Sequence, residues 1–144
     1  MKYQLEVNIQ KPIDEVVKLF ITQENLFKWM PGLKKLELIA GEKGNPGSKT
    51  KLFFDMNGKD IEMIETLHIS NLPEEFTATF EAKGVVNKQT TRFKKIDENN
   101  TIYESDNEFY FSGFMKIMNL MSSAFKKQSR KYLEAFKKFA ENEG

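Results

Sequence analysis

Two spacings of apolar residues follow each other along this chain and predict an α+β fold. Residues 2–10 alternate strictly between polar and apolar side chains, which is the period of a strand with one buried face. From Ile13 to Ile21 the apolar residues recur every three or four positions, which predicts a helix. A second, short helix is expected from Asn25 to Met30, and Leu33 to Ala40 predicts another strand.

A meander of hairpins is expected next, because β-rich segments alternate with turn-forming residues. A loop from Gly41 to Gly47 precedes them. The segments are Lys49–Met56, Lys59–Asn71, Glu75–Lys83, Val85–Ile96 and Thr101–Phe111. Because short turns such as Asn57-Gly58 join them, neighbouring strands are expected to pair in antiparallel orientation.

The last part of the chain, from about Gly113 to Asn142, predicts one long amphipathic helix. It has no internal Gly or Pro and its apolar residues recur at helical steps, so a helix about 40 Å long is expected. The expected fold is a curved antiparallel sheet of about seven strands, with two short N-terminal helices and the long C-terminal helix covering its apolar face. Because twist makes such a sheet curl, a cavity between sheet and helix is expected.

Composition and charge narrow the function classes. The 144 residues are expected to form one domain, residues 1–144. Lys and Arg total 22 against 21 Asp and Glu, and the net charge of +1 argues against nucleic acid as a partner. There is no cysteine, no signal-like N-terminus and no apolar run of the ~20 residues that cross a membrane. We therefore expect a cytoplasmic protein without integral membrane association, whose 13 Phe and 7 Met fill or line a sizeable interior.

Several motifs along the chain carry more than periodicity. They are Ile13-Asp14-Glu15-Val16-Val17-Lys18-Leu19-Phe20, Gln23-Glu24-Asn25-Leu26-Phe27-Lys28-Trp29-Met30-Pro31-Gly32-Leu33, Gly44-Asn45-Pro46-Gly47-Ser48, Leu72-Pro73-Glu74-Glu75-Phe76 and Asn100-Thr101-Ile102-Tyr103. Over essentially the whole chain they resemble the START-like superfamily, also called SRPBCC, and most closely its polyketide cyclase/dehydrase-type and birch-pollen-allergen-like branches. The resemblance implies a helix-grip fold around an internal pocket. Lipid carriers, metabolite binders, cyclases, oxygenase subunits and heat-shock ATPase activators share that fold, so it leaves the activity open.

Glu65 is the polar exception in an otherwise apolar row. Alternation along its strand places on one face Ile61, Met63, Glu65, Leu67 and Ile69. In a cavity, the Glu65 carboxylate would anchor a ligand or act as a general base with a raised pKa. The alternative is that Glu65 pairs with a lysine of a neighbouring strand or lies near the sheet edge.

The next two strands are expected to turn uncharged polar groups inward. With Phe93 inward, alternation also directs inward Asn87, Gln89 and Thr91. On the following strand the inward residues are Tyr103, Ser105, Asn107, Phe109 and Phe111, while Glu104, Asp106 and Glu108 face water. Such groups would orient an apolar ligand that has a polar end. The alternative is that they are surface polar residues on a twisted edge.

The sequence gives little support for a metal site or for a catalytic nucleophile. His68 is the only histidine, so no zinc-binding histidine pair can form. It lies on the polar face of its strand, so we expect it to be exposed rather than catalytic. The loop Gly41–Thr50 departs from a P-loop because Ser48 precedes Lys49 and a strand follows. We expect a solvated hairpin loop, and no cofactor or metal. The family resemblance implies that this loop borders the pocket mouth, where it would act as a lid.

The first half of the long helix is apolar over a wide arc, which suits an adaptable pocket wall. Its later part carries a basic outer face, expected to be solvated, with attraction to anionic lipid as the alternative: Lys126, Lys127, Arg130, Lys131, Lys137 and Lys138. Trp29 is expected to attach the second helix to the core or, alternatively, to touch the ligand. The candidate ligand-lining residues are Trp29, Leu52, Phe54, Met63, Glu65, Leu67, Phe80, Asn87, Gln89, Thr91, Tyr103, Ser105, Asn107, Phe109, Phe114, Met115, Met118, Met121 and Phe125.

Three functions remain open from the sequence. The first is binding or transport of an apolar small molecule, lipid-like, aromatic or polyketide-like, in the internal cavity. The second is an enzyme of the cyclase, dehydratase or isomerase type with Glu65 as its base. The third is a cochaperone-like module that binds proteins through an exposed apolar patch on the outside of the sheet.

Overall fold

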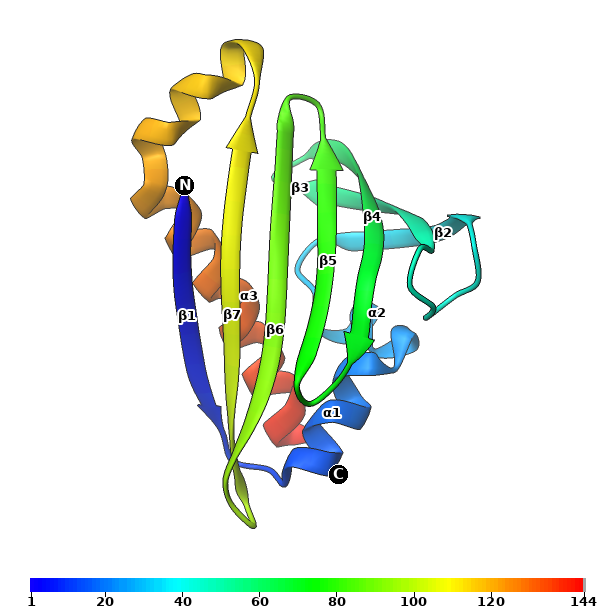
Figure 1. Ribbon diagram of the computed structural model, residues 1–144, viewed down its shortest axis with the longest axis vertical. Helices are drawn as coiled ribbons and strands as arrows, with labels where there is room; N and C mark the ends of the chain where they lie inside the picture. The colour runs from blue at the N-terminus through cyan, green and yellow to red at the C-terminus, as the bar shows by residue number, and fades with distance from the viewer. Residues whose placement is uncertain (144) are drawn as a thin grey trace.

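A single antiparallel sheet of seven strands dominates the computed structural model, which describes residues 1–143 (Figure 1). The strands are β1 (Lys2–Ile9), β2 (Leu33–Ala40), β3 (Lys49–Met56), β4 (Lys59–Asn71), β5 (Glu75–Ala82), β6 (Val85–Asp97) and β7 (Asn100–Phe111). The helices are α1 (Ile13–Ile21), α2 (Leu26–Trp29) and α3 (Ser122–Asn142), with 3₁₀ segments η1 (Gln23–Asn25) and η2 (Gly113–Met121). These bounds agree with the sequence-based elements to within about two residues, except in the C-terminal helix.

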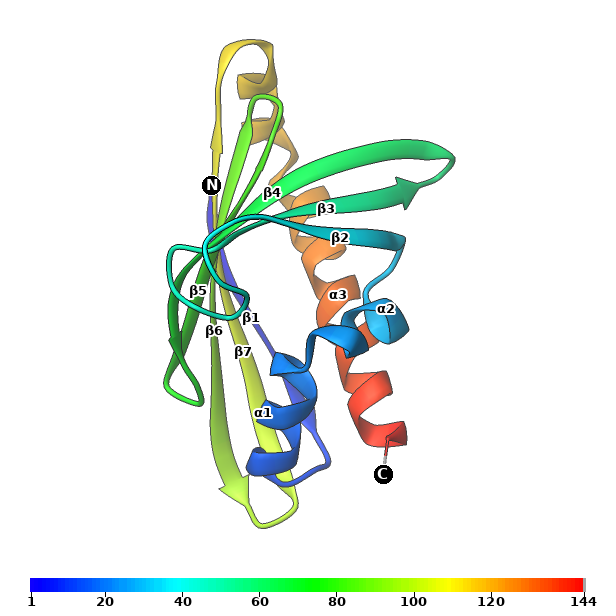
Figure 2. The same cartoon turned by 90° about the vertical axis from the view of Figure 1, so that its right-hand side faces the viewer.

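The strand order β1-β7-β6-β5-β4-β3-β2 follows from the hairpins. Each consecutive pair from β2 to β7 is adjacent, and β1 pairs with β7, so β1 and β2 form the two edges. The segment α1, η1 and α2 connects one edge to the other. Figure 2 shows the three α-helices on one side of the sheet, with the β3 and β4 hairpin curving toward that same, concave side.

The packed core lies on the concave face where α1, α2 and α3 meet β1, β6 and β7. Phe136 of α3 is fully buried at its centre. Its ring makes edge-on contacts with Phe20 at 5.4 Å, Trp29 at 5.1 Å and Tyr103 at 5.5 Å between centroids. Trp29 therefore attaches α2 to the core, as the first of the two sequence-based interpretations had it.

The inward register expected for β6 and β7 is confirmed. Phe93 lies opposite Tyr103, and Gln89 lies opposite Asn107, on the face that packs against the helices. On β4 the expectation fails beyond Leu67, because a bulge inserts one extra residue there. Ile69 consequently pairs with Thr77 and is 40% exposed, instead of continuing the inward row.

The C-terminal helix is not one continuous α-helix. Its first nine residues form the 3₁₀ segment η2, in which no residue is buried, and regular α-helix begins only at Ser122. Over nine residues the two helix types differ by only about half a turn, so apolar periodicity does not distinguish them. Because η2 packs little apolar surface, tertiary contacts do not select the α form there.

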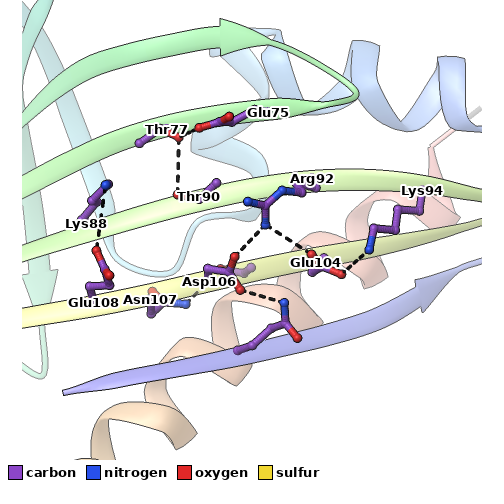
Figure 3. Close-up of polar contacts among 12 residues, drawn as sticks. Glu75, Thr77, Lys88, Thr90, Arg92, Lys94, Glu104, Asp106, Asn107 and Glu108 are labelled. Carbon is purple, nitrogen blue, oxygen red and sulfur yellow. Dashed lines mark hydrogen bonds and ion pairs between the residues drawn. The ribbon is translucent and has the colours of Figure 1, made fainter.

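Ion pairs cover the convex face of β6 and β7 (Figure 3). Arg92 lies 3.3 Å from Glu104 and 2.6 Å from Asp106, and Lys94 lies 2.9 Å from the second oxygen of Glu104. Glu104 faces outward, as expected, but the two basic side chains bury it to 8% exposure, where the sequence pattern indicated a side chain in water. This face is therefore charged and fully paired at its centre.

Candidate functional site

Beyond the packed core, the concave face carries apolar side chains that keep part of their surface exposed. They come from β4 to β7, η2 and the start of α3: Met63, Phe80, Phe109, Phe111, Met115 and Phe125. A close-packed interior would bury such side chains. We call this part of the sheet, together with Glu65, Asn87, Gln89 and Asn107, the open half of the concave face.

Glu65 points into this open half without a charged partner. Its cross-strand neighbours are Thr50 and Phe80. The lysines of β3 face the other way: Lys49 donates a hydrogen bond to Thr66, and Lys51 pairs with Glu62 on the convex side. Among the residues that the structure describes, no ion pair or hydrogen bond reaches the Glu65 carboxylate, so the alternative of a lysine partner is wrong. Burial raises the pKa of Glu65 to about 7.

An uncharged cluster of amides lies on β6 and β7. Asn87 Nδ2 donates to the carbonyl of Glu108 at 3.1 Å, and Gln89 Nε2 donates to Asn87 Oδ1 at 2.7 Å. Asn107 Nδ2 donates to Ser105 Oγ at 3.0 Å. Asn107 is only 2% exposed, and its Oδ1 has no partner among residues 1–143. A buried acceptor without a donor costs free energy.

Aromatic rings form the wall beside this cluster. Phe125 of α3 lies 5.0 Å from Phe109 and 5.3 Å from Phe111 between ring centroids. The Tyr3 hydroxyl donates to the carbonyl of Phe125 at 3.0 Å and lies 2.6 Å from Ser129 Oγ. These bonds hold the start of α3 against β1 and β7, so the wall has a fixed position relative to the amides.

The structure brings together only some of the expected lining residues. Met63, Glu65, Phe80, Asn87, Gln89, Asn107, Phe109, Met115 and Phe125 share the open half, and Met118 is half-buried on η2. Trp29 and Tyr103 belong to the aromatic core. The remaining inward residues are buried on the concave side of their strands: Leu52, Phe54, Leu67, Thr91 and Ser105. Phe114 is fully exposed and Met121 is 47% exposed, so the structure does not bring these two to the others.

Two residues on the concave side were not among the candidate ligand-lining residues, although Phe111 was expected to face inward. Thr50 lies directly across from Glu65, and Phe111 continues the row of Phe109. Both carry the same signal that identified their neighbours, since period-two alternation places Thr50 with Leu52 and Phe111 with Phe109. His68, by contrast, lies where the pattern placed it, exposed and hydrogen-bonded to Thr79 Oγ1 at 3.0 Å.

Two surface hollows are lined mainly by residues outside the open half, although Asn107 borders the first of them. One, of about 340 Å³, is lined mainly by outward-facing residues of β1, β6 and β7, including Lys2, Lys88 and Glu108. The other, of about 420 Å³, is lined by Lys34, Asp60 and Glu62 together with Phe53, Phe54 and Ile61. At least half of the residues that line each hollow are charged, which does not suit an apolar ligand. Neither hollow is the cavity expected between sheet and helix.

Two further absences apply to residues 1–143. No three His, Asp or Glu side chains in that range converge as metal ligands would. No helix there combines the length and apolarity needed to cross a bilayer. The neighbours of Glu65, a threonine and a phenylalanine, add no second carboxylate or imidazole to it.

Comparison with known proteins gives the same architecture at low sequence similarity. No family profile and no curated protein matches the chain. Among solved structures, ZhuI aromatase/cyclase from Streptomyces sp. R1128 is similar with a TM-score of 0.80 at 15% identity, covering 98% of this chain and 93% of the other. Ara h 8.0201 gives 0.78 at 15% identity, covering 97% of both chains. A START superfamily protein from Mycobacterium smegmatis gives 0.71 at 10% identity, covering 96% and 98%.

Proposed function

We propose, on the premise that this chain has the START-like helix-grip fold, that it binds an apolar small molecule on the open half of the concave face. The observation that carries the proposal is the combination of partly exposed aromatic and methionine side chains with the unpartnered Asn107 Oδ1. Apolar ligands bury their surface against such walls and are oriented by a few polar groups.

The polar groups also indicate the character of the ligand's polar end. Asn107 Oδ1 and the Glu65 carboxylate are both hydrogen-bond acceptors, and neither has a partner among the described residues. A ligand with a donating group, such as a phenolic hydroxyl or an N–H, would satisfy them. ZhuI, by its name, acts as an aromatase/cyclase, which makes an aromatic or polyketide-like ligand a reasonable class to test first.

Binding is tested with N-phenyl-1-naphthylamine, an apolar fluorescent molecule that carries one N–H donor. We expect saturable binding, and Phe125→Ala should weaken it about tenfold, because the variant removes one ring from the wall. Fluorescence titration measures both dissociation constants.

Phe27→Ala is the matched control, since Phe27 is 50% exposed on α2 and lies outside the open half. It should bind the probe as the unmodified protein does. Equal weakening in both variants, or no saturable binding together with no co-purified small molecule in native mass spectrometry, would remove the proposal.

A second function, proton transfer to or from a bound carbonyl compound, is favoured by Glu65 alone. A general base works best when its pKa lies near the working pH, and burial places that of Glu65 at about 7. Asn87, Gln89 and Asn107 would supply polarising amides on the same face. The third sequence-based function, a protein-binding module, requires an apolar patch on the outer face of the sheet. The centre of that face carries the paired charges of Arg92, Lys94 and Glu104 instead.

Catalysis by Glu65 is tested by deuterium exchange into benzoylacetone, an apolar β-diketone with an acidic C–H. If the chain is such an enzyme, it accelerates exchange and Glu65→Gln lowers the rate about 100-fold, while probe binding is retained. NMR follows the exchange. An exchange rate equal to that in buffer, or the same rate in Glu65→Gln as in the unmodified protein, would rule out the enzymatic function. The binding function would be unaffected by either result.

A further inference from the structure

Four large apolar side chains project into solvent from η2. Their exposed fractions are 101% for Phe114, 62% for Ile117, 85% for Leu120 and 47% for Met121. We call these four residues the apolar tip. Scattered apolar residues on a protein surface need no explanation, but four within one short segment form a contiguous patch, which marks an interaction site.

All charged residues in the segment around the apolar tip are basic. Residues 109–133 contain Lys116, Lys126, Lys127, Arg130 and Lys131 and no Asp or Glu. This segment carries +5 in a chain whose net charge is +1, which leaves −4 for all other residues. The five basic side chains are exposed, and no ion pair within residues 1–143 involves any of them.

The apolar tip is held at one end of the molecule. Figures 1 and 2 show η2 beyond the end of β7, next to the turn between β5 and β6 and far from the turn between β6 and β7. Met115 packs on Gly84 in that turn, where a Cβ atom would lie 2.7 Å from Met115 Cγ. Lys83, in the same turn, adds another exposed basic side chain. Lys116 within η2 and Lys83 in the adjoining turn thus place basic groups beside the apolar tip, and the other four basic side chains follow on α3.

We propose that the apolar tip docks on the surface of an anionic lipid bilayer. Phe114, Ile117 and Leu120 insert at the level of the acyl boundary, and the basic side chains of residues 109–133 lie among the anionic headgroups. The mode is interfacial, because no described helix is able to span a bilayer. Charge also argues against a second copy as the occupant, since two +5 segments would face each other.

Docking goes beyond the binding function and is independent of it, although the geometry connects the two. The apolar tip continues directly from β7, whose last residues Phe109 and Phe111 belong to the open half. A bilayer held at the tip would therefore lie next to the ligand-binding surface. Apolar molecules would pass between them over a short path.

The experiment is flotation of the full chain with vesicles of phosphatidylcholine, with and without about one-third phosphatidylserine. We expect the protein to float only with the anionic vesicles, and to be released by high salt. Phe114→Ser combined with Leu120→Ser should weaken vesicle binding at least about tenfold, as should Lys126→Glu combined with Lys127→Glu. Ile96→Ser is the control, because Ile96 is 54% exposed on β6, outside residues 109–133.

Three results of flotation and light scattering would overturn the proposal. The first is no flotation with either vesicle, and the second is flotation that the tip variants do not weaken. The third is a dimer, seen by light scattering, that the tip variants dissociate, because the patch would then serve a second copy. In a Phe114→Trp variant, a blue shift of the added emission on mixing with anionic vesicles supports insertion, whereas an unchanged spectrum contradicts it. Titration of each variant with N-phenyl-1-naphthylamine separates loss of docking from loss of the ligand site.

Discussion

Phe136→Ala is expected to lower the free energy of unfolding by about 4 kcal/mol, the largest effect of any single substitution considered. Phe136 is fully buried, and its ring contacts aromatic side chains from α1, α2, β6 and β7. Truncation removes the transfer free energy of the ring and leaves a cavity whose rigid aromatic walls collapse only partly. Urea denaturation followed by circular dichroism measures the change.

Phe114→Ala is the matched control for this prediction. It makes the same chemical change at a side chain that is fully exposed, so the free energy of unfolding should change by less than about 0.5 kcal/mol. If the two variants were equally stable, Phe136 would not occupy the centre of the core. The packing of α3 against the sheet would then be wrong.

Stability should fall as pH rises through the range in which Glu65 ionises in the folded protein. Burial raises the pKa of this carboxyl from 4.5 to about 7, so between these values the folded state holds a proton that the unfolded state has released. The stabilisation is fully present below pH 4.5, declines as pH rises and is lost above pH 7. An increase in pKa of this size corresponds to about 3 kcal/mol.

Glu65→Gln removes the titrating group while keeping a similar volume. The variant should therefore gain stability over the unmodified protein as pH rises from 4.5 to 7, by up to about 3 kcal/mol, and keep that advantage at higher pH. Denaturation at a series of pH values checks this. Glu62→Gln, on the exposed face of the same strand, should change stability by less than about 0.5 kcal/mol throughout. Parallel curves for Glu65→Gln and the unmodified protein would show that Glu65 is solvated, because its pKa would then be the same in the folded and unfolded states.

The two proposed functions make different use of this carboxyl. As a ligand anchor, Glu65 accepts a hydrogen bond and needs no particular protonation state during binding. As a base, it must ionise in the working pH range, which the raised pKa allows. Probe binding and deuterium exchange measured on the same Glu65→Gln preparation separate the roles.

Local patterns in the sequence determined the elements and much of the candidate site. Period-two alternation gave the inward register of β6 and β7, and hence the positions of Asn87, Gln89 and Asn107, because those strands are regular and tightly connected. The single-residue bulge after Leu67 could not be predicted. An extra residue leaves no mark in hydrophobicity, so Ile69 had the pattern of an inward residue and still points outward.

Only the tertiary structure determined the environment of Glu65 and the exposure of the apolar tip. The sequence identified Glu65 as a carboxyl in an apolar row, but the absence of a lysine partner follows from the pairing of β3 with β4, which directs Lys49 and Lys51 to the convex side. Likewise, Phe114 and Phe125 both belong to the apolar residues that recur at helical steps in this segment. Phe114 is nevertheless fully exposed, whereas Phe125 lies against Phe109 of β7. Side-chain period is a local property of the chain, whereas burial depends on which distant segment lies opposite.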